Sequence, residues 1–357
     1  MTNAMLELDT DHKKMVEEFG AKYLDKEKSP DYYTFQNELL YAHIDFDKFL
    51  SAVKSRKKCA IVSGFNPSGT IHIGHKSVFD TNLYFQEKHN CDVYIPLSDD
   101  ESYVARKVES QEEALKNAYR LAKEILAYGY NPKKTHFIID QIYTNIYNLA
   151  FKYSRQITLS TTKAVYGYKD ETNIGLTFYP SVQAAHVTLP QYKGYAYTLV
   201  PIGIDEYNHL RIARDVAAKF NITKPAVVLS RFMPGLDGAK MSSSKPQTAI
   251  FLKDGINDIQ KKIDRAMSGG RDTLAEHKKY GGNPEKDMSY IYLKSYFLAA
   301  KQAKKIANNY KSGKMLSSEM KELLFKHVKK YLQNFQKRYS KITDKKVEKC
   351  FLRNEIK

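Results

Sequence analysis

One short stretch decides the fold: residues 59–75 read CAIVSGFNPSGTIHIGH. The stretch begins with a short apolar run that ends at Gly64, which is typical of a buried strand. The Pro-Ser-Gly sequence at 67–69 then predicts a turn, and a helix is expected to begin near Gly74. A strand, a turn and a helix in this order put glycine and polar residues where open α/β sheets bind ligands.

The same alternation of strands and helices continues to about residue 253. Further strands are predicted at 92–97, 136–139, 198–202 and 226–229, and an amphipathic helix is predicted over 110–128. Strands that alternate with helices indicate an α/β domain with a mainly parallel sheet. Pro96 favours the end of its strand, because proline cannot donate a ladder hydrogen bond.

Three segments follow from this pattern. Residues 1–55 are charged and mostly helical in pattern, and residues 56–253 form the α/β domain, with a helical insertion over about 105–195. Residues 254–357 form a helical domain, because apolar and aromatic residues between Leu323 and Phe335 recur at helical spacing.

The charge distribution points to a polyanionic partner. The 357-residue chain has a formal net charge of +17, and residues 301–357 alone hold 17 Lys/Arg against 5 Asp/Glu. General solubility is the alternative, but it does not explain why the excess collects at one end. The sequence therefore favours nucleic acid as a partner.

Cysteine usage and hydropathy indicate the compartment. Cys59, Cys91 and Cys350 are scattered and show no Cys-x-x-Cys spacing, which argues against a disulfide framework or a cysteine zinc site. No run approaches the roughly 18 apolar residues of a membrane span, and the charged N-terminus does not resemble a secretory leader. We therefore expect a cytoplasmic protein with no membrane partner.

Two elements have the composition of a phosphate site. His72 and His75 can donate hydrogen bonds to phosphate oxygens, and Gly74 lets a nucleotide lie close to the helix start. Lys240, 165 residues after His75, follows a glycine-rich loop and precedes Met241 and a run of serines. An ammonium and several hydroxyls suit a departing pyrophosphate. Polar residues at a helix start and a basic surface loop are the structural alternatives.

Acidic residues follow two of the predicted strands. Asp205 comes after the strand at 198–202 and can accept a hydrogen bond from a ribose hydroxyl. Asp99, Asp100 and Glu101 come after another strand and allow a metal-site interpretation. We favour a substrate-facing role for Glu101, and helix capping is the alternative for the two aspartates.

Together these motifs resemble the ATP-binding elements of class I aminoacyl-tRNA synthetases. The elements that carry this resemblance are His-Ile-Gly-His at 72–75, Lys-Met-Ser-Ser-Ser at 240–244, and Gly203-x-Asp205-x-x-x-His209. Longer blocks are similar to tryptophanyl-tRNA synthetases of the archaeal/eukaryotic branch, at 99–101, 178–185, 268–284 and 311–316. The resemblance covers about residues 55–340. It implies a Rossmann-like parallel-sheet catalytic domain with inserted helices and a C-terminal all-helical anticodon-binding domain.

The resemblance also implies an activity and a set of site residues. L-tryptophan and ATP, with Mg²⁺, would give tryptophanyl-adenylate, which the 2′-hydroxyl of tRNA(Trp) then captures; a homodimer through the helices at 105–195 is implied too. The implied catalytic residues are His72, His75 and Lys240. The implied ATP contacts are Gly64, Asn66, Ser68, His72, Gly74, His75, Gly203, Asp205, Lys240, Met241, Ser242 and Ser244. The implied amino acid contacts are Glu101, Gln183 and Glu206, and the implied anticodon contacts are Arg271 and Asp272.

Three departures from the family pattern bear on the substrate. Ser243 stands where the family usually has lysine or alanine, so Lys240 must supply the charge of its loop, and Glu206 replaces a glutamine. Val62 and Pro96 stand where the eukaryotic relatives place a tyrosine and a glutamine on the indole nitrogen. Either the indole N–H has another acceptor, or the substrate differs.

Three alternative functions stay open. A tyrosyl-tRNA synthetase shares both ATP motifs, but the block at 268–284 argues against it. A small-molecule nucleotidyltransferase of the same superfamily is disfavoured by the Lys240 loop and the basic tail. A catalytically silent RNA-binding protein is disfavoured by the intact histidines at 72 and 75.

Overall fold

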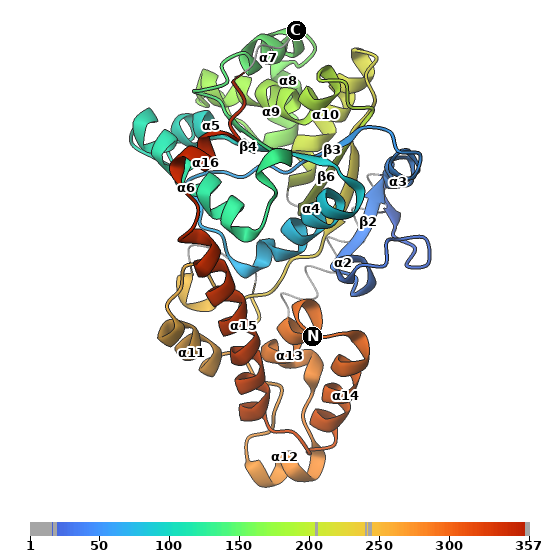
Figure 1. The fold of residues 1–357 in the computed structure, drawn as a ribbon, viewed down its shortest axis with the longest axis vertical. Coiled ribbons are helices and arrows are strands. Elements are labelled where there is room, and N and C mark those ends of the chain that lie inside the picture. The colour runs from blue at the N-terminus through green and yellow to red at the C-terminus, as the bar shows by residue number, and fades with distance from the viewer. Residues whose placement is uncertain (1–15, 17–19, 204–205, 240, 242–244, 354–357) are drawn as a thin grey trace. The chain divides into compact units, whose positions relative to one another are not determined.

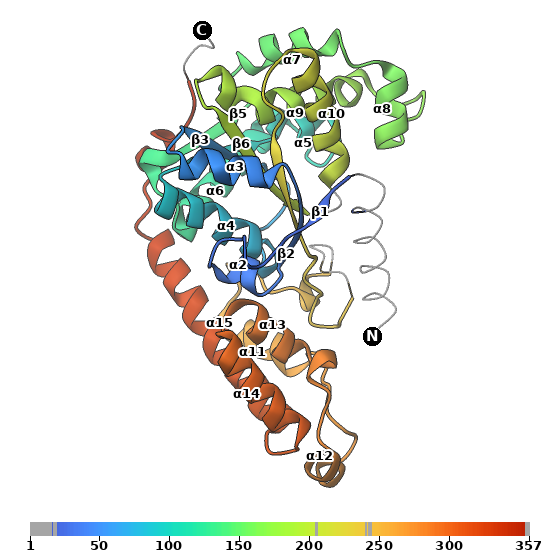
Figure 2. The same ribbon diagram turned by 90° about the vertical axis from the view of Figure 1, so that its right-hand side faces the viewer.

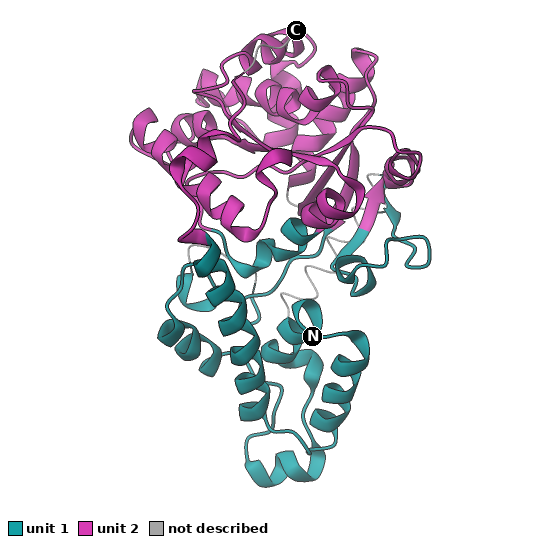
Figure 3. Cartoon of the chain, viewed as in Figure 1, with its two compact units in different colours: residues 1–41, 71–80, 230–338 teal, residues 42–70, 81–229, 339–357 magenta. Residues whose placement is uncertain are grey.

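The computed structural model describes residues 16, 20–203, 206–239, 241 and 245–353 of the chain. The chain divides into two compact units, and each is discontinuous in sequence (Figure 3). Unit 1 holds residues 1–41, 71–80 and 230–338, and unit 2 holds residues 42–70, 81–229 and 339–357. Within the described part of the chain, no helix is both long enough and apolar enough to cross a membrane.

The strands form one sheet in the order β1-β2-β7-β6-β3-β4-β5. Their bounds are β1 (Lys22–Tyr23), β2 (Leu40–Ile44), β3 (Cys59–Val62), β4 (Asp92–Leu97), β5 (Thr135–Ile139), β6 (Tyr197–Gly203) and β7 (Ala226–Ser230). β3 pairs in parallel with both β4 and β6, so that Ile61 lies opposite Val93 on one side and Leu199 on the other. β4 and β5 are parallel too, and the predicted mainly parallel sheet is confirmed.

Helices connect the strands and continue alone after the last one. Up to β7 they are α2 (Tyr33–Gln36), α3 (Phe46–Lys54), η1 (Ile73–His75), α4 (Lys76–His89), α5 (Asp99–Val104), α6 (Gln111–Tyr128), η2 (Pro132–Lys134), α7 (Ile146–Ser154), α8 (Leu159–Tyr166), α9 (Ile174–Tyr192) and α10 (Tyr207–Lys219). After β7 they are η4 (Pro246–Thr248), α11 (Ile256–Asp264), α12 (Leu274–Tyr280), η5 (Pro284–Lys286), α13 (Met288–Tyr296), α14 (Ala300–Lys311), α15 (Ser317–Tyr339) and α16 (Asp344–Glu348).

Helices cover both faces of the sheet in unit 2, with α3, α4 and α6 on one face and α7, α9 and α10 on the other (Figures 1 and 2). The chain runs from β3 outward to β4 and β5, and then returns to β6 on the other side of β3. The winding therefore reverses between β3 and β6. In open α/β sheets this reversal marks the ligand-binding edge, at the carboxyl ends of the strands.

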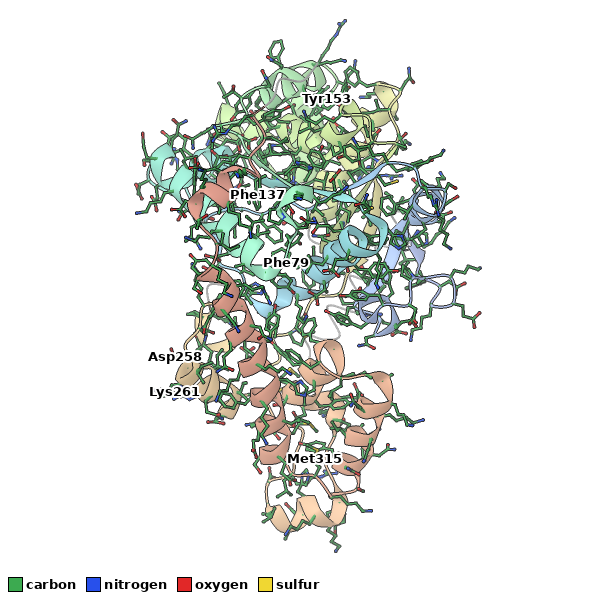
Figure 4. The ribbon with its side chains drawn as sticks, viewed as in Figure 1. Phe79, Phe137, Tyr153, Asp258, Lys261 and Met315 are labelled. Carbon is green, nitrogen blue, oxygen red and sulfur yellow. The ribbon has the colours of Figure 1, made fainter. Side chains whose placement is uncertain are left out.

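Burial on both faces explains why the strands are continuous apolar runs. Ile61, Val93 and Phe137 have no exposed surface, and Figure 4 labels Phe137 in the core and Tyr153 among the helices of one face. Pro96 is the second-last residue of β4 and lies opposite Ile138 of β5. Its carbonyl accepts a hydrogen bond from the N–H of Phe65, which follows β3. The proline thus keeps its acceptor in the ladder while lacking the donor.

The expectation of a mostly helical N-terminal segment is wrong for part of its described residues. Besides α2 and α3, the segment holds the strands β1 and β2. Leu40, Tyr41 and Ala42 are buried in β2, which joins the sheet beside β7. Short apolar runs fit a helix as well as a strand, and the charged residues around β2 favoured the helical interpretation.

The helices after β7 follow the predicted pattern. In α11, Ile259 and Ile263 are buried, whereas Asp258 and Lys261 point outward (Figure 4). In α15 the predicted apolar stripe is buried, and it comprises Leu324, Val328, Leu332 and Phe335. Residues 339–357 belong to unit 2, where the Cys350 carbonyl accepts a hydrogen bond from Phe137 in β5 at 2.7 Å. The domain boundaries near residues 55 and 254 stay predictions.

Candidate active site

The His72–His75 turn belongs to unit 1 and is held by its own side chains. His72 Nδ1 accepts a hydrogen bond from the Gly74 N–H at 3.1 Å, and His75 Nδ1 accepts one from the His72 N–H at 3.2 Å. The two rings stack with their centroids 4.0 Å apart. Because His72 Nδ1 accepts, the proton of the neutral His72 ring is assigned to Nε2, whereas His75 Nδ1 also lies 3.2 Å from the His72 carbonyl oxygen. His72 therefore has an N–H donor at Nε2.

The turn is also tied to the segment that follows the Lys240 loop. The Ile73 N–H donates to the Ile250 carbonyl at 2.9 Å, and His72 pairs with Phe251 in an antiparallel bridge. A Cβ at Gly74 would lie 2.9 Å from the His72 ring and 3.2 Å from Met241 Sδ. Gly74 therefore needs to be glycine, and Met241 of the second motif contacts the first motif there.

Burial, followed by the nearby His75, lowers the pKa of His72 to about 3. The neutral His72 ring contributes fully to folding stability at pH values above 6.5, the ordinary pKa of histidine. That contribution is lost as the pH falls from 6.5 toward about 3, because the unfolded chain binds the proton first. We expect the ring carbons of His72 to show no titration between about pH 8 and about pH 5 in an NMR experiment. His72→Asn would assign the signal, and a midpoint near the ordinary value would contradict the burial argument.

A second group of candidate residues lies in unit 2, beyond β3 and β4. Asn66 Oδ1 accepts hydrogen bonds from the Ser68 N–H at 3.0 Å, from Ser68 Oγ at 2.6 Å and from Ser102 Oγ at 2.9 Å. Its amide donates to Glu101, which also pairs with Lys107 Nζ at 2.9 Å. The family resemblance implied ATP contacts for Asn66 and Ser68 and an amino acid contact for Glu101, and the structure brings the three side chains together.

The other predicted amino acid contacts lie in the same unit. Gln183 stands on α9 one turn after Tyr179, whose hydroxyl donates to Ser98 at 2.7 Å. Gln183 Oε1 is buried and, within the described part of the chain, has no hydrogen-bond partner. Glu206 precedes α10 and lies 3.6 Å from His209 Nε2. An unpaired buried oxygen is costly, so a ligand donor at Gln183 would stabilise the site.

Two tyrosines that the sequence did not single out connect the acidic residues. The rings of Tyr166 and Tyr168 stack with their centroids 5.1 Å apart. Burial raises the pKa of both hydroxyls. Glu206 adds to the rise at Tyr166 and Glu101 adds to it at Tyr168. Nothing in the Tyr-Gly-Tyr sequence marks this position, because the contact depends on the return of α8 toward α10.

Val62, Gly64, Pro96 and Gly203 lie at or close to the carboxyl ends of β3, β4 and β6. Val62 ends β3, Gly203 ends β6, and a Cβ at Gly64 would lie 3.7 Å from the Pro96 carbonyl oxygen. Four predicted contacts lie outside the described residues: Asp205, Lys240, Ser242 and Ser244.

Comparisons with known proteins identify the family of the chain. The family model described as tRNA synthetases class I (W and Y) matches residues 54–333. The chain belongs to this family of class I tRNA synthetases. A tryptophan–tRNA ligase of Methanocaldococcus jannaschii is 37% identical over 92% of both chains, and one of Thermococcus onnurineus is 35% identical over 97% of this chain and 92% of its own. A solved Plasmodium falciparum tryptophanyl-tRNA synthetase has a TM-score of 0.88 and 32% identity, and the match covers 96% of this chain and 98% of that one.

In this chain Asp99, Asp100 and Asp140 form a cluster of acidic side chains, and the first two directly precede Glu101 in sequence. Asp99 accepts hydrogen bonds from the backbone N–H groups of Asp140, at 2.7 Å, and Gln141, at 3.3 Å. Asp140 contacts His186 Nε2 at 2.7 Å. Burial raises the pKa of Asp100 and Asp140 well above the ordinary range, and burial lowers the pKa of His186 to about 4. Oxygens of Asp99, Asp100 and Asp140 lie within 4.8 Å of one another.

The spacing of these carboxylates would suit a cation, but most of their hydrogen bonds join them to other parts of the protein. The oxygens of Asp99 face two backbone donors, and Asp140 faces an imidazole. The interpretation of Asp99 as a cap of its own helix is wrong, because its side chain caps the turn after β5 instead. In this synthetase Asp99 therefore holds β5 and α5 together beside Glu101.

The predicted anticodon block of the synthetase surrounds α12 in unit 1. Thr273 and Glu276 form a capping box at the start of α12, and Arg271 Nε donates to the Gly281 carbonyl at 3.0 Å. Arg271 and Asp272 are exposed, and so are Leu274 and Tyr280 at the two ends of α12. Exposed rings beside charged groups are typical of surfaces that stack on unpaired RNA bases.

Proposed function

We propose that this class I synthetase activates L-tryptophan with ATP and transfers it to tRNA(Trp). The observation that carries the proposal is the 37% identity to a tryptophan–tRNA ligase over 92% of both chains. The other relatives named above act on tryptophan by their names, so the tyrosine alternative is not favoured. Family membership also disfavours a nucleotidyltransferase outside the synthetases and a silent RNA-binding protein.

In the first step the tryptophan carboxylate attacks the α-phosphorus of ATP, and pyrophosphate leaves. The carboxylate is already ionised, so the protein supplies no nucleophile; positioning and charge stabilisation do the work. The imidazole rings of His72 and His75 are proposed to face the ATP phosphates, with His72 donating from Nε2, and Lys240 is proposed to offset the charge of the departing pyrophosphate. The proposed ATP contacts are Gly64, Asn66, Ser68, Gly74, Gly203, Asp205, Met241, Ser242 and Ser244.

The α-ammonium group of the substrate is proposed to bind among Glu101, Gln183 and Glu206. The unpaired Oε1 of Gln183 supports this, because an ammonium donor satisfies it. Lys107 shares the Glu101 carboxylate, so the substrate ammonium competes with a neighbouring lysine there. Selection of the indole side chain requires a further acceptor, because neither Val62 nor Pro96 has a side-chain acceptor.

Mg²⁺ is proposed only as a counter-ion of the ATP phosphates. Asp99, Asp100 and Asp140 have cation-like spacing, but both Asp99 oxygens accept backbone hydrogen bonds and Asp140 Oδ1 contacts His186, which leaves Asp140 Oδ2 as the buried oxygen without a partner among the described residues. One unpaired oxygen does not make a magnesium site, because Mg²⁺ requires an octahedral set of ligands. We assign no protein ligand to the ion.

In the second step the terminal 2′-hydroxyl of tRNA attacks the adenylate carbonyl and AMP leaves. The lysines of residues 301–357 are proposed to hold the tRNA backbone, because phosphate contacts release counterions and give tight, salt-dependent binding. Arg271 and Asp272 are proposed to contact the anticodon, with the exposed Tyr280 ring as a stacking surface.

Arg271→Ala should reduce discrimination between cognate and non-cognate tRNA by about 1–3 kcal/mol, the worth of one good base contact. The measurement is kcat/KM for charging of each tRNA. Lys278→Ala is the matched control, because it removes an exposed positive charge of α12 and should weaken all tRNAs alike. Equal damage to tRNA-independent pyrophosphate exchange would contradict anticodon reading and assign Arg271 to holding Gly281.

A homodimer is proposed from the same family and is supported by exposed apolar side chains. Phe151, Leu159 and Ile174 are 74%, 56% and 85% exposed on α7, α8 and the start of α9. Phe151→Glu should lower the sedimenting mass from that of a dimer to that of a monomer. A monomeric parent chain would contradict the proposal.

A cytoplasmic location is proposed because all three thiols are free and buried.

The decisive experiment is pyrophosphate exchange with each of the twenty amino acids. We expect exchange with tryptophan and strong rejection of tyrosine, whose phenol leaves polar groups unpaired in an indole site. The chain contains no tryptophan, so indole fluorescence in a washed complex reports the ligand alone. Exchange with tyrosine and not tryptophan would reverse the substrate assignment.

A further inference from the structure

The residue that follows the His72–His75 turn is a lysine buried between two tyrosine rings. Lys76 Nζ lies 5.4 Å from the ring centroid of Tyr33 and 5.0 Å from that of Tyr331. It pairs with Asp80 one turn further along α4, and the two charged side chains are 11% and 10% exposed. The Tyr33 hydroxyl donates to the same carboxylate at 2.5 Å. We call these four residues the Lys76 clamp.

The clamp joins three stretches of unit 1 that are distant in sequence. Tyr33 comes from α2, Lys76 and Asp80 come from α4, and Tyr331 comes from α15. A further bond fixes the end of α2 in the same unit, since Asn37 Nδ2 donates to a carbonyl of α13 at 3.1 Å. An ammonium group withdrawn from water is stable only with its counter-ion and rings in place. The clamp therefore holds the three stretches in one arrangement.

The clamp and the bridge to Phe251 hold opposite ends of the same turn. Ile73 is bonded to Ile250 at the start of the turn, and Lys76 is the first residue of α4 at its end. The charge of Lys76 is offset by Asp80, so the lysine is not placed as a phosphate ligand. Its effect on the reaction has to pass through the position of the His75 ring.

We propose that Lys76 is a positioning residue for adenylate formation, and that the Lys76 clamp fixes the His72–His75 turn to helix α15. This inference rests on the proposed function, because it assigns a role in the same site. It also gives the tRNA-binding helices a physical connection to the ATP motif, since Tyr331 belongs to the basic segment proposed to hold tRNA.

The test is tryptophan-dependent pyrophosphate exchange by the full chain with altered clamps. Lys76→Met keeps the length of the side chain without its charge, and Tyr331→Leu removes one ring. We expect each to lower kcat about tenfold, because a displacement near 1 Å can cost about 10²-fold. KM for tryptophan should stay within about twofold, since Glu101 and Gln183 belong to unit 2. Combining the two substitutions should cost less than the product of their effects, because both break one clamp.

Conservative variants and a matched control separate positioning from general destabilisation. Lys76→Arg and Tyr331→Phe keep the cation and the ring and should restore most of kcat. Lys294→Met is the control, because Lys294 also lies over a tyrosine and beside a carboxylate, at 6.0 Å and 3.6 Å, but is 49% exposed. It should match the parent chain.

The possible outcomes distinguish the inference from the proposed function. A parent chain without exchange activity would overturn both. An active parent with an equally active Lys76→Met would overturn the clamp alone. The clamp would also be overturned if kcat fell only in proportion to the folded fraction measured by circular dichroism. A rise in KM for tryptophan as large as the fall in kcat would overturn it as well.

Discussion

Lys240→Ala should slow tryptophan-dependent pyrophosphate exchange by about 10²–10³-fold, the loss typical of one stabilising donor at a developing charge. The charge on the leaving pyrophosphate is largest in the transition state, so an ammonium group there lowers kcat rather than amino acid binding when it is lost. The adjacent Met241 contacts Gly74 of the first motif, which links the two motifs within unit 1.

The measurement is kcat and KM for tryptophan and ATP in exchange without tRNA. Lys240→Arg is the matched variant, because it keeps the charge but changes the shape of the donor, and it should recover part of the rate. KM for tryptophan should not change in either variant. Exchange at the parental rate by the alanine variant would refute the role of Lys240 in pyrophosphate departure.

Asp99→Ala should lower the free energy of unfolding by about 2–4 kcal/mol, because it leaves two backbone donors in the interior without an acceptor. The side chain is fully buried and accepts from Asp140 and Gln141, which begin the turn after β5. Its removal also frees the first turn of α5, which carries Glu101. Tryptophan binding should therefore weaken together with stability.

Chemical denaturation followed by circular dichroism checks the first effect, and KM for tryptophan checks the second. Asp99→Asn should lie between the parent and the alanine variant, since its amide oxygen still accepts one bond. Asp170→Ala is the surface control. The Asp170 side chain is 88% exposed, so its ion pair with Lys163 should contribute little to the free energy of unfolding. A parental unfolding profile for Asp99→Ala would contradict the capping role.

The sequence predicted those parts of the fold that depend on local patterns. Apolar runs gave five of the strands, and helical spacing gave α6, where the Ser110 side chain caps the first turn as a serine in that position should. The strand β1 was missed because it has only two residues, both of them exposed. The strand β2 was missed because its apolar residues stand among charged residues and fit a helix as well as a strand.

The candidate site divides in the same way. His72, Gly74 and His75 belong to one short motif and Met241 to a second, both recognisable in the sequence, and the structure brings the two motifs together in unit 1. The bond between Asn66 and Glu101, the capping of the β5 turn by Asp99 and the Tyr166–Tyr168 stack could not. Each depends on elements brought together by the sheet order, which a single sequence does not specify.

The discontinuity of unit 1 has a consequence for biosynthesis. The His72–His75 turn is bonded to Ile250 and Phe251, which are made roughly 175 residues later. At about 5–20 residues per second, the ribosome adds these partners about 9–35 s after the turn has been polymerised. Throughout that interval the nascent chain carries its nucleotide motif without the segment that shapes it. The His72–His75 turn therefore takes its final form late in translation, after the strands of the sheet have been made.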